Sequence, residues 1–428
     1  MKKTIFILTL LLPFGLLCAQ SNVVQINGGL NSVEVSQVGE DNHSDVFTNG
    51  SMNAFSFVNQ AGNGLNESSV NQHGWGNNVD VDQNNEYTKM FDANNSMINQ
   101  DGNWNSASVK QIGVNSWLGS PRNSDIFQGG DDNDASVEQK GSVLNSVVNQ
   151  GGSSNDAEVK QGGMFVEAVV FEPGDKNGAE VKQDGSWVNG FVLQEGDRND
   201  AEMIQKGTML DADIVQPGDR NDAKVVQEGT VLMANVHQSG RGNDAEIKQE
   251  GGILLNAVIN QEGKDGNAIQ YQGKGKYFDG PEAKYNDAYI HQGGAVWGGS
   301  KAEQYQEGMQ NNAVIEQNSG LMSKAVQIQV NDKTSYTGPM TTDVNQAYIY
   351  QNGMAHNTAY QVQYFEGSGN PNMANVVQEG SFNYSQEVQL GGDNLSTVHQ
   401  VGFGNNSVVF QNVHGVTESG FSGLPISY

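Results

Sequence analysis

Residues 194–207 read QEGDRNDAEMIQKG, and residues 216–229 read QPGDRNDAKVVQEG. Nine of the fourteen positions are identical, and the second stretch begins twenty-two residues after the first. Looser copies of the same phrase recur over most of the chain. Repetition at a fixed interval is typical of a repeat architecture, in which stacked copies of one small unit share a continuous core.

A glutamine recurs every eleven residues through the middle of the chain, and we take it as the anchor of the repeat. The anchors of this unbroken series are Gln139, Gln150, Gln161, Glu172 in place of a glutamine, Gln183, Gln194, Gln205, Gln216, Gln227, Gln238 and Gln249. A glycine follows each anchor by two residues, and we expect these glycines to adopt turn conformations that other residues avoid. The turn glycines assigned in this way are Gly152, Gly163, Gly174, Gly185, Gly196, Gly207, Gly218 and Gly229.

The residues before each anchor alternate in character. In the repeat that ends at Gln161, Ala157 and Val159 alternate with Glu158 and Lys160. A period of two that ends at a glycine indicates a short strand followed by a turn. We therefore expect the alanine, the valine and the glutamine to point into a core and the two charged residues to face solvent.

Two kinds of strand alternate along the chain, so the full unit is twenty-two residues long. The sixth residue before the anchor is asparagine in one kind and leucine or valine in the other. The asparagines expected in the core are Asn155, Asn177, Asn199, Asn221 and Asn243. The predicted fold is all-β: a β-solenoid of strand–turn–strand coils with about 22 residues per coil, made of two 11-residue half-repeats.

The inward amide side chains can be buried at low cost only if stacked coils supply their hydrogen-bond partners. A buried amide without a partner costs a few kcal/mol. When coils stack in register about 4.8 Å apart, each Gln or Asn side chain can donate to its equivalent in one neighbouring coil and accept from the other. We therefore expect the Gln and Asn columns to form continuous hydrogen-bonded ladders.

The outward columns differ between the two kinds of strand. The asparagine-type strands carry acidic residues such as Asp156 and Glu158, partly offset by Lys160. The other kind carries outward apolar residues such as Phe171 and Phe191. We interpret the charged face as exposed to solvent, and the apolar face either as a lateral contact surface or as a set of incidental surface hydrophobes.

The regularity of the repeat divides the chain into six segments. They are a signal peptide (1–19), irregular repeats (20–127), the regular solenoid (128–272), a solenoid with loop insertions (273–351), C-terminal repeats (352–411) and a tail or cap (412–428).

The N-terminal sequence MKKTIFILTLLLPFGLLCAQ combines a short basic start, an apolar run and a small residue. This pattern predicts a secretory signal peptide that is cleaved between Ala19 and Gln20. The single cysteine, Cys18, then leaves with the signal; its alternative role is a lipid-modified N-terminus. We expect a secreted mature chain that has no disulfide and no apolar segment long enough to insert into a membrane.

Composition narrows the function further. The formal net charge of −27 disfavours nucleic acid and anionic lipid as partners. The seven histidines are scattered without the spacing of metal ligands or of a catalytic triad, so we predict no enzyme, no cofactor and no specific metal site. An enzyme built on a β-helix would gather its catalytic residues by departing from the repeat, whereas the acidic columns follow the repeat. Calcium-binding β-rolls have a nine-residue period instead of eleven.

The full phrase from one anchor to the next is Gln-x-Gly-x-x-Asn-x-Ala-x-x-x-Gln. It occurs as Gln150, Gly152, Asn155, Ala157 and Gln161, and it recurs from Gln100, Gln128, Gln194, Gln216 and Gln238. This phrase resembles the curlin repeat of curli subunits, which assemble into amyloid fibres on bacterial surfaces. The resemblance implies a secreted, extracellular structural protein of the cell surface that self-associates into fibres. It also implies curli-type secretion and assembly proteins as partners, and a role in surface adhesion and biofilm matrix.

Three departures from that family keep an alternative open. The chain is longer than typical curli subunits, and its interruptions between Gly273 and Gln351 are foreign to them. Leu144 and Val188 also stand where the family often has serine. The alternative is a β-solenoid surface adhesin that does not polymerise and instead binds extracellular glycans or cations.

Overall fold

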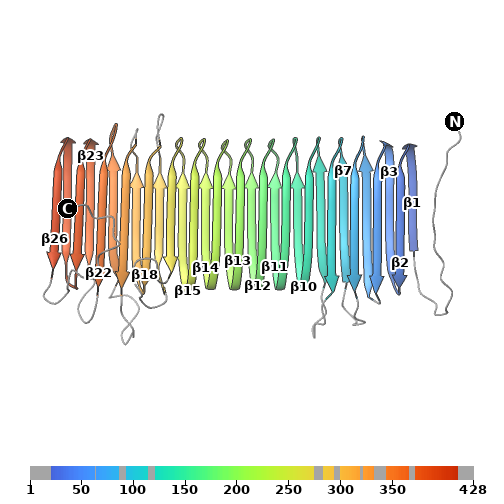
Figure 1. Ribbon diagram of the computed structural model, residues 1–428, viewed down its shortest axis with the longest axis horizontal. Coiled ribbons are helices and arrows are strands. Elements are labelled where there is room, and N and C mark those ends of the chain that lie inside the picture. The colour runs from blue at the N-terminus through green and yellow to red at the C-terminus, as the bar shows by residue number, and fades with distance from the viewer. Residues whose placement is uncertain are drawn as a thin grey trace. The chain divides into compact units, whose positions relative to one another are not determined.

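The computed structural model describes residues 21–62, 64–85, 93–113, 121–273, 283–293, 299–318, 322–331, 344–365 and 372–412. The signal peptide with its predicted cleavage site at Ala19 and Gln20, much of the predicted loop insertions, and the tail after Asn412 lie outside the described residues. The described chain is built of β-strands joined by turns (Figure 1). Nowhere in these ranges is there a helix with the length and apolar character needed to cross a membrane.

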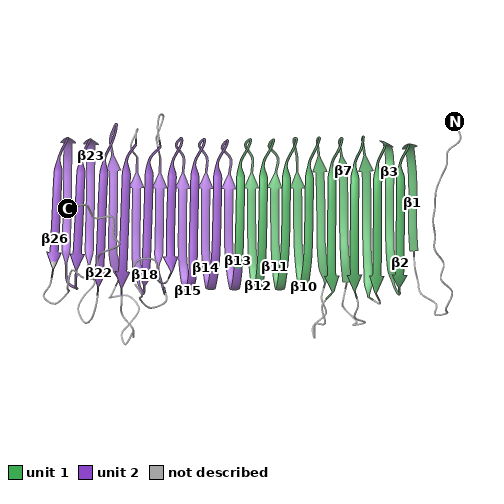
Figure 2. Ribbon diagram, in the orientation of Figure 1, with its two compact units in different colours: residues 1–205 green, residues 206–428 purple. Residues whose placement is uncertain are grey.

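The chain divides into two compact units, residues 1–205 and 206–428 (Figure 2). The strands of the first unit are β1 (Ser21–Gly29), β2 (Ser32–Gly39), β3 (Asn42–Met52), β4 (Phe55–Gly62), β5 (Leu65–His73), β6 (Asn78–Asn85), β7 (Ala93–Asp101), β8 (Ser106–Gly113), β9 (Arg122–Gly129), β10 (Asp134–Gln150), β11 (Asp156–Glu172) and β12 (Gly178–Gln194). The next strand, β13 (Asp200–Gln216), contains the boundary between the units.

The second unit continues the strand numbering. Its further strands are β14 (Asp222–Gln238), β15 (Asp244–Gln261), β16 (Asn267–Gly273), β17 (Asp287–Gln292), β18 (Lys301–Gly308), β19 (Asn311–Gln317), β20 (Lys324–Asn331), β21 (Asn345–Asn352), β22 (Thr358–Phe365), β23 (Met373–Ser381), β24 (Tyr384–Leu390), β25 (Leu395–Phe403) and β26 (Asn406–Asn412).

Strand pairing in each unit is parallel and links equivalent positions of successive coils. In the first unit β10 pairs with β11 and β11 with β12, so that Gln139, Gln161 and Gln183 lie side by side. In the second unit β15 pairs with β17, and Gln261 lies opposite Gln292 although the two are thirty-one residues apart. Equivalent residues of successive coils therefore still pair where extra residues are inserted between them. The predicted β-solenoid is confirmed in each unit.

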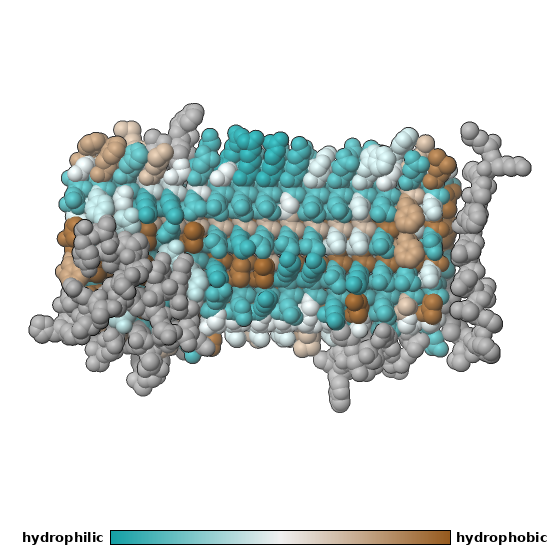
Figure 3. Space-filling view, in the orientation of Figure 1, coloured by the Kyte–Doolittle hydropathy of each residue, from teal (hydrophilic) through white to brown (hydrophobic). Residues whose placement is uncertain are grey.

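The core of each unit lies between the two half-coils and follows the predicted alternation. In β11, Ala157, Val159 and Gln161 are buried, whereas Asp156 is exposed and Glu158 is half-buried. Leu144 and Val166, the apolar residues six positions before their anchors, are each 1% exposed. Because the regular coils from β10 to β15 repeat these contacts, the buried columns run through the regular part of each unit. On the outer surface, rows of hydrophilic side chains alternate with more hydrophobic rows (Figure 3).

The two turns of a coil differ in kind. The expected turn after Gly141 or Gly163 is a bend inside one long strand, and parallel pairing continues on both sides of it. Val143, Phe165 and Trp187 make this bend with positive φ angles of 56°, 58° and 60°. A bulky residue with positive φ is unusual, and here it recurs once per coil. The bend brings the second half of the strand back against the first.

Candidate assembly surface: the amide ladders

The first unit contains a continuous ladder of eight glutamine side chains. In each step the Nε2 of one glutamine donates to the Oε1 of the next, over distances from 2.6 to 3.2 Å. The members in order are Gln37, Gln60, Gln83, Gln111, Gln139, Gln161, Gln183 and Gln205. All donors point the same way along the chain, so the ladder has one acceptor end and one donor end.

From Gln60 onward, each ladder amide also binds the opposite half-coil. Gln161 Nε2 donates to the carbonyl oxygen of Asn145 at 2.8 Å, and Gln183 Nε2 to that of Glu167 at 2.9 Å. One amide hydrogen thus links neighbouring coils while the other links the two half-coils. This arrangement satisfies the buried amide and offsets the cost of removing it from water.

A second ladder in the first unit runs through the other half-coils and meets a carboxylate. Gln72, Gln100, Gln128 and Gln150 are joined by Nε2–Oε1 bonds of 2.8 to 3.0 Å, and Gln150 Nε2 then donates to Glu172 Oε2 at 2.8 Å. Glu172 is fully buried, and its Oε1 has no hydrogen-bond partner. Burial, opposed by the bond from Gln150 and reinforced by the charge of Asp156, raises the pKa of Glu172 to about 8.

The second unit carries the same two ladders. One joins Gln227, Gln249, Gln272, Gln306, Gln329, Gln363, Gln389 and Gln411. The other joins Gln216, Gln238, Gln261, Gln292, Gln317, Gln351, Gln378 and Gln400. Every step measures between 2.7 and 3.0 Å, including those that bridge insertions. Of the glutamines assigned to the core from the sequence, all ten are buried.

Sequence reasoning missed a third ladder in the second unit. It joins Gln270, Gln304, Gln327, Gln361 and Glu387 at the inward position where earlier coils have valine or isoleucine. The signal was present as a recurring Gln-x-Gln, as in Gln270 and Gln272. Glu387 closes this ladder and accepts from Ser396 Oγ at 2.8 Å; burial raises its pKa, against the effect of its two hydrogen bonds.

The core asparagines are joined differently from the amide-to-amide ladder expected of them. The backbone N–H of Asn177 donates to Asn155 Oδ1 at 2.9 Å, and that of Asn199 donates to Asn177 Oδ1 at 2.9 Å. Asn155 Nδ2 donates to the carbonyl oxygen of Gly174 at 2.7 Å, in the turn of the next coil. Asn221 and Asn243 in the second unit repeat the backbone link at 3.0 Å. The asparagine side chain therefore ties a turn to the turn above it.

The turn glycines have two different reasons to be glycine. Gly163 has a φ of 92°, in the region that favours glycine, and so do Gly152, Gly185, Gly207 and Gly229 at their own angles. Gly174 and Gly218 do not lie in that region. A Cβ at Gly174 would instead overlap the carbonyl oxygen of Gly196, and one at Gly218 would overlap that of Gly240. For these two, close stacking of coils and not backbone angle excludes a side chain.

The outward charged face is typical of a solvated surface. Lys160 forms an ion pair with Glu158, and Lys182 with Glu180, all with side chains more than a third exposed. Such pairs contribute little to stability. Burial raises the pKa of Asp156, and the neighbouring carboxylates of Asp134 and Glu158 add to the effect. Among the described residues no three His, Cys, Asp or Glu side chains are grouped so as to hold a metal ion.

Comparison with known proteins agrees with this geometry. The family model of the curlin associated repeat matches residues 130–163, 174–207 and 207–251. This part of the chain therefore carries curlin-type repeats. The matched segments cover the most regular coils, where anchors, turn glycines and asparagines recur without a slip. A comparison with curated proteins finds no match for this chain.

Proposed function

We propose that this curlin-repeat protein is a secreted structural subunit that polymerises into curli-like amyloid fibres by stacking its end coils. The single observation that carries the proposal is the direction of the glutamine ladders. Each ladder step donates toward the C-terminus, so a stack of coils begins with an open acceptor and finishes with an open donor.

The N-terminal end of the first unit offers the acceptor. Gln37 Oε1, at the start of its ladder, is a buried atom without a hydrogen-bond partner. The inward residues Val24 and Ile26 of β1 are only half-buried, whereas Val46, the partner of Val24 in the next coil, is 0% exposed. An additional coil on this end would bury both residues and supply the missing donor.

The C-terminal end of the second unit offers the donor. Gln411 Oε1 accepts from Gln389 Nε2, and Gln411 Nε2 donates across the coil to the carbonyl oxygen of Leu395. By the pattern of the other coils, its second amide hydrogen is directed toward a further coil, which the described residues do not provide. The outer residues Phe403 and Phe410 are 75% and 53% exposed. Open strand edges of this kind recruit further strands.

Stacking the C-terminal coil of one copy on the N-terminal coil of the next would extend both the strands and the ladders. Secretion through curli-type assembly proteins, and a role in adhesion and biofilm matrix, follow from the family resemblance and belong to the same proposal. The surface-adhesin alternative uses the same solenoid with closed ends, and it predicts a persistently soluble protein.

The test is to incubate the purified chain from Gln20 to Tyr428, follow thioflavin fluorescence, and record fibre diffraction of the product. The substitution pair Val24→Lys and Ile26→Lys places charges on the inward side of the first coil. We expect it to abolish elongation while circular dichroism still reports β-structure. The matched control is Val23→Lys, an outward position of the same strand that is 46% exposed, and it should elongate normally. Wild-type protein that stays soluble, or equal elongation by both variants, would refute end stacking.

A further inference from the structure

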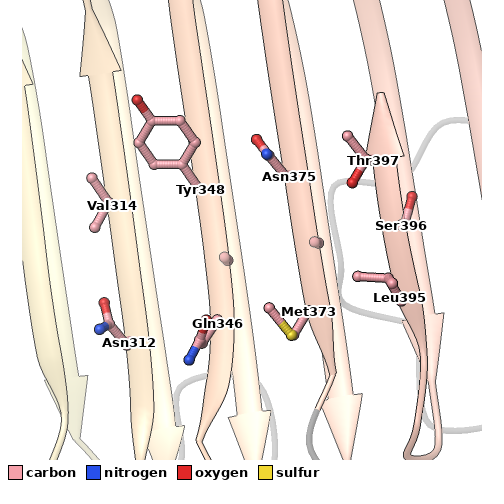
Figure 4. Close-up of a pocket in the computed structure, with 11 residues that line it drawn as sticks. Asn312, Val314, Gln346, Tyr348, Met373, Asn375, Leu395, Ser396 and Thr397 are labelled. Atoms are coloured by element: carbon pink, nitrogen blue, oxygen red, sulfur yellow. The ribbon is translucent and has the colours of Figure 1, made fainter. Parts of the chain in front are cut away.

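A groove with a volume of about 360 Å³ lies on the outer face of β19, β21, β23 and β25 in the second unit (Figure 4). Two rows of side chains flank it. Tyr348, Asn375 and Thr397 form one row, and Gln346, Met373 and Leu395 form the other. Each row consists of residues that lie directly opposite one another on paired strands. The groove therefore runs across the strands, along the direction in which coils stack, for about 14 Å.

The groove is uncharged in a strongly acidic chain. None of its lining residues is Asp, Glu, Lys, Arg or His, whereas the whole chain has 49 acidic and 22 basic residues. Its floor is formed by small residues such as Ala347 and Ala374. A charged ligand would gain nothing from this lining, and an anionic one would be repelled by the surrounding charge.

Tyr348 presents a fixed aromatic surface to the groove. Its side chain is half-buried, and its hydroxyl donates to Glu316 Oε2 at 3.1 Å. Burial, together with this bond and the charge of Glu316, raises the pKa of Tyr348 to about 12, so the ring stays neutral. Met373 and Leu395 add exposed apolar surface, at 46% and 66% exposure. These groups suit the C–H face of a ring-shaped ligand.

Asn375 supplies an unsatisfied polar group in the same groove. Its Oδ1 is buried and has no hydrogen-bond partner. A buried acceptor without a partner costs free energy, which is recovered if the half-buried side chain rotates and turns Oδ1 toward a donor of a ligand in the groove. Gln346 and Thr397, both exposed, add further amide and hydroxyl groups nearby.

We infer that this groove binds a neutral glycan chain, with a sugar ring against Tyr348 and a sugar hydroxyl donating to Asn375 Oδ1. A neutral polysaccharide combines C–H faces with hydroxyl donors and carries no charge, which matches the lining. A groove that crosses four strands, about 14 Å, suits several linked sugar rings rather than a single sugar. The site does not depend on polymerisation, because all its residues belong to the second unit of one chain.

The inference is tested by native affinity electrophoresis of freshly purified, unassembled full-length protein. The gels contain hydroxyethyl cellulose, a neutral glucan, or carboxymethyl cellulose, which has the same backbone with carboxylate groups. We expect the neutral polymer to retard the protein and the charged polymer to leave its mobility unchanged. Added glucose should not compete, whereas cellohexaose should. No retardation by the neutral polymer, stronger retardation by the charged one, or competition by glucose equal to that by cellohexaose would overturn the inference.

The variants locate the site. Tyr348→Ala should weaken the apparent affinity about tenfold, the loss expected for one aromatic contact. The matched control is Tyr360→Ala, which removes a half-buried outward tyrosine of β22, in the other half-coil and outside the groove. Thr397→Arg changes only an exposed side chain and should also abolish retardation by blocking the groove. Loss of binding in the Tyr360 variant equal to that in the Tyr348 variant, or full binding by the Thr397 variant, would place the glycan elsewhere.

Discussion

Glu172 interrupts an otherwise neutral amide ladder, and replacing it with glutamine gives a prediction with a definite sign. The folded protein holds this carboxyl at 0% exposure with one hydrogen bond from Gln150, and its pKa is about 8 instead of the usual 4.5. A raised carboxyl pKa means that the folded state binds the proton more tightly than the unfolded chain. Ionisation of Glu172 therefore destabilises the folded state. The free energy of unfolding keeps its full value below about pH 4.5, where the carboxyl is protonated in both states, and it falls as the pH rises toward about 8.

The size of the effect follows from the two pKa values. At about 1.4 kcal/mol per tenfold change in proton affinity, the loss reaches about 3 kcal/mol at pH 7 and about 5 kcal/mol above pH 8. Glu172→Gln removes the ionisation and keeps the shape of the side chain. We expect the variant to match the wild type near pH 4.5 and to exceed its stability increasingly as the pH rises.

The assay is urea unfolding of unassembled protein, followed by circular dichroism at pH values from 4.5 to 9. The matched control is Glu167→Gln in the same strand, where the carboxylate is exposed and accepts a bond from Asn145 Nδ2. It should leave the pH dependence of the unfolding midpoint unchanged. A wild-type midpoint that does not fall between pH 5 and 8, or a Glu172→Gln curve parallel to it, would show that the buried carboxyl is not held neutral.

Three further predictions follow from the ladders and turns. Gly174→Ala should lower the free energy of unfolding by about 2 kcal/mol or more, because the new Cβ overlaps the next coil. The control Gly29→Ala should change this free energy little, because no atom lies within 4 Å of the position of its Cβ. Equal urea midpoints for the two variants would contradict the prediction. Val231→Asn should raise the melting temperature, since valine is strained at its φ of 57° and asparagine tolerates that region; a lower melting temperature would refute the assignment of strain. Gln161→Leu should lower the free energy of unfolding in urea by about 2 kcal/mol or more, because Gln139 loses its acceptor and Gln183 its donor. The control, Lys160→Leu at the neighbouring outward position, should lower it much less. Comparable losses would mean that the ladder contributes little to stability.

The sequence determined the architecture of the regular coils. The unbroken step of eleven residues and the period of two identify inward Ala157, Val159 and Gln161, because a strand exposes alternate residues to opposite faces. Stacking in register then follows, since a slip by one residue would turn every core side chain outward. The burial of Leu144 and its equivalents followed from the same pattern.

Only the tertiary structure decided how these columns bond and where they depart from the repeat. Periodicity along one strand does not specify which atoms of the neighbouring coil come within reach, so the backbone link of Asn155 could not be foreseen. It also does not report that Gln261 pairs with Gln292 across an insertion, or that Glu172 stays unpaired at one oxygen. The groove beside Tyr348 could not be predicted from periodicity either, because outward residues of several coils line it together. Hydrogen-bond direction, desolvation and surface shape are properties of neighbours brought together by stacking, and a single strand does not contain them.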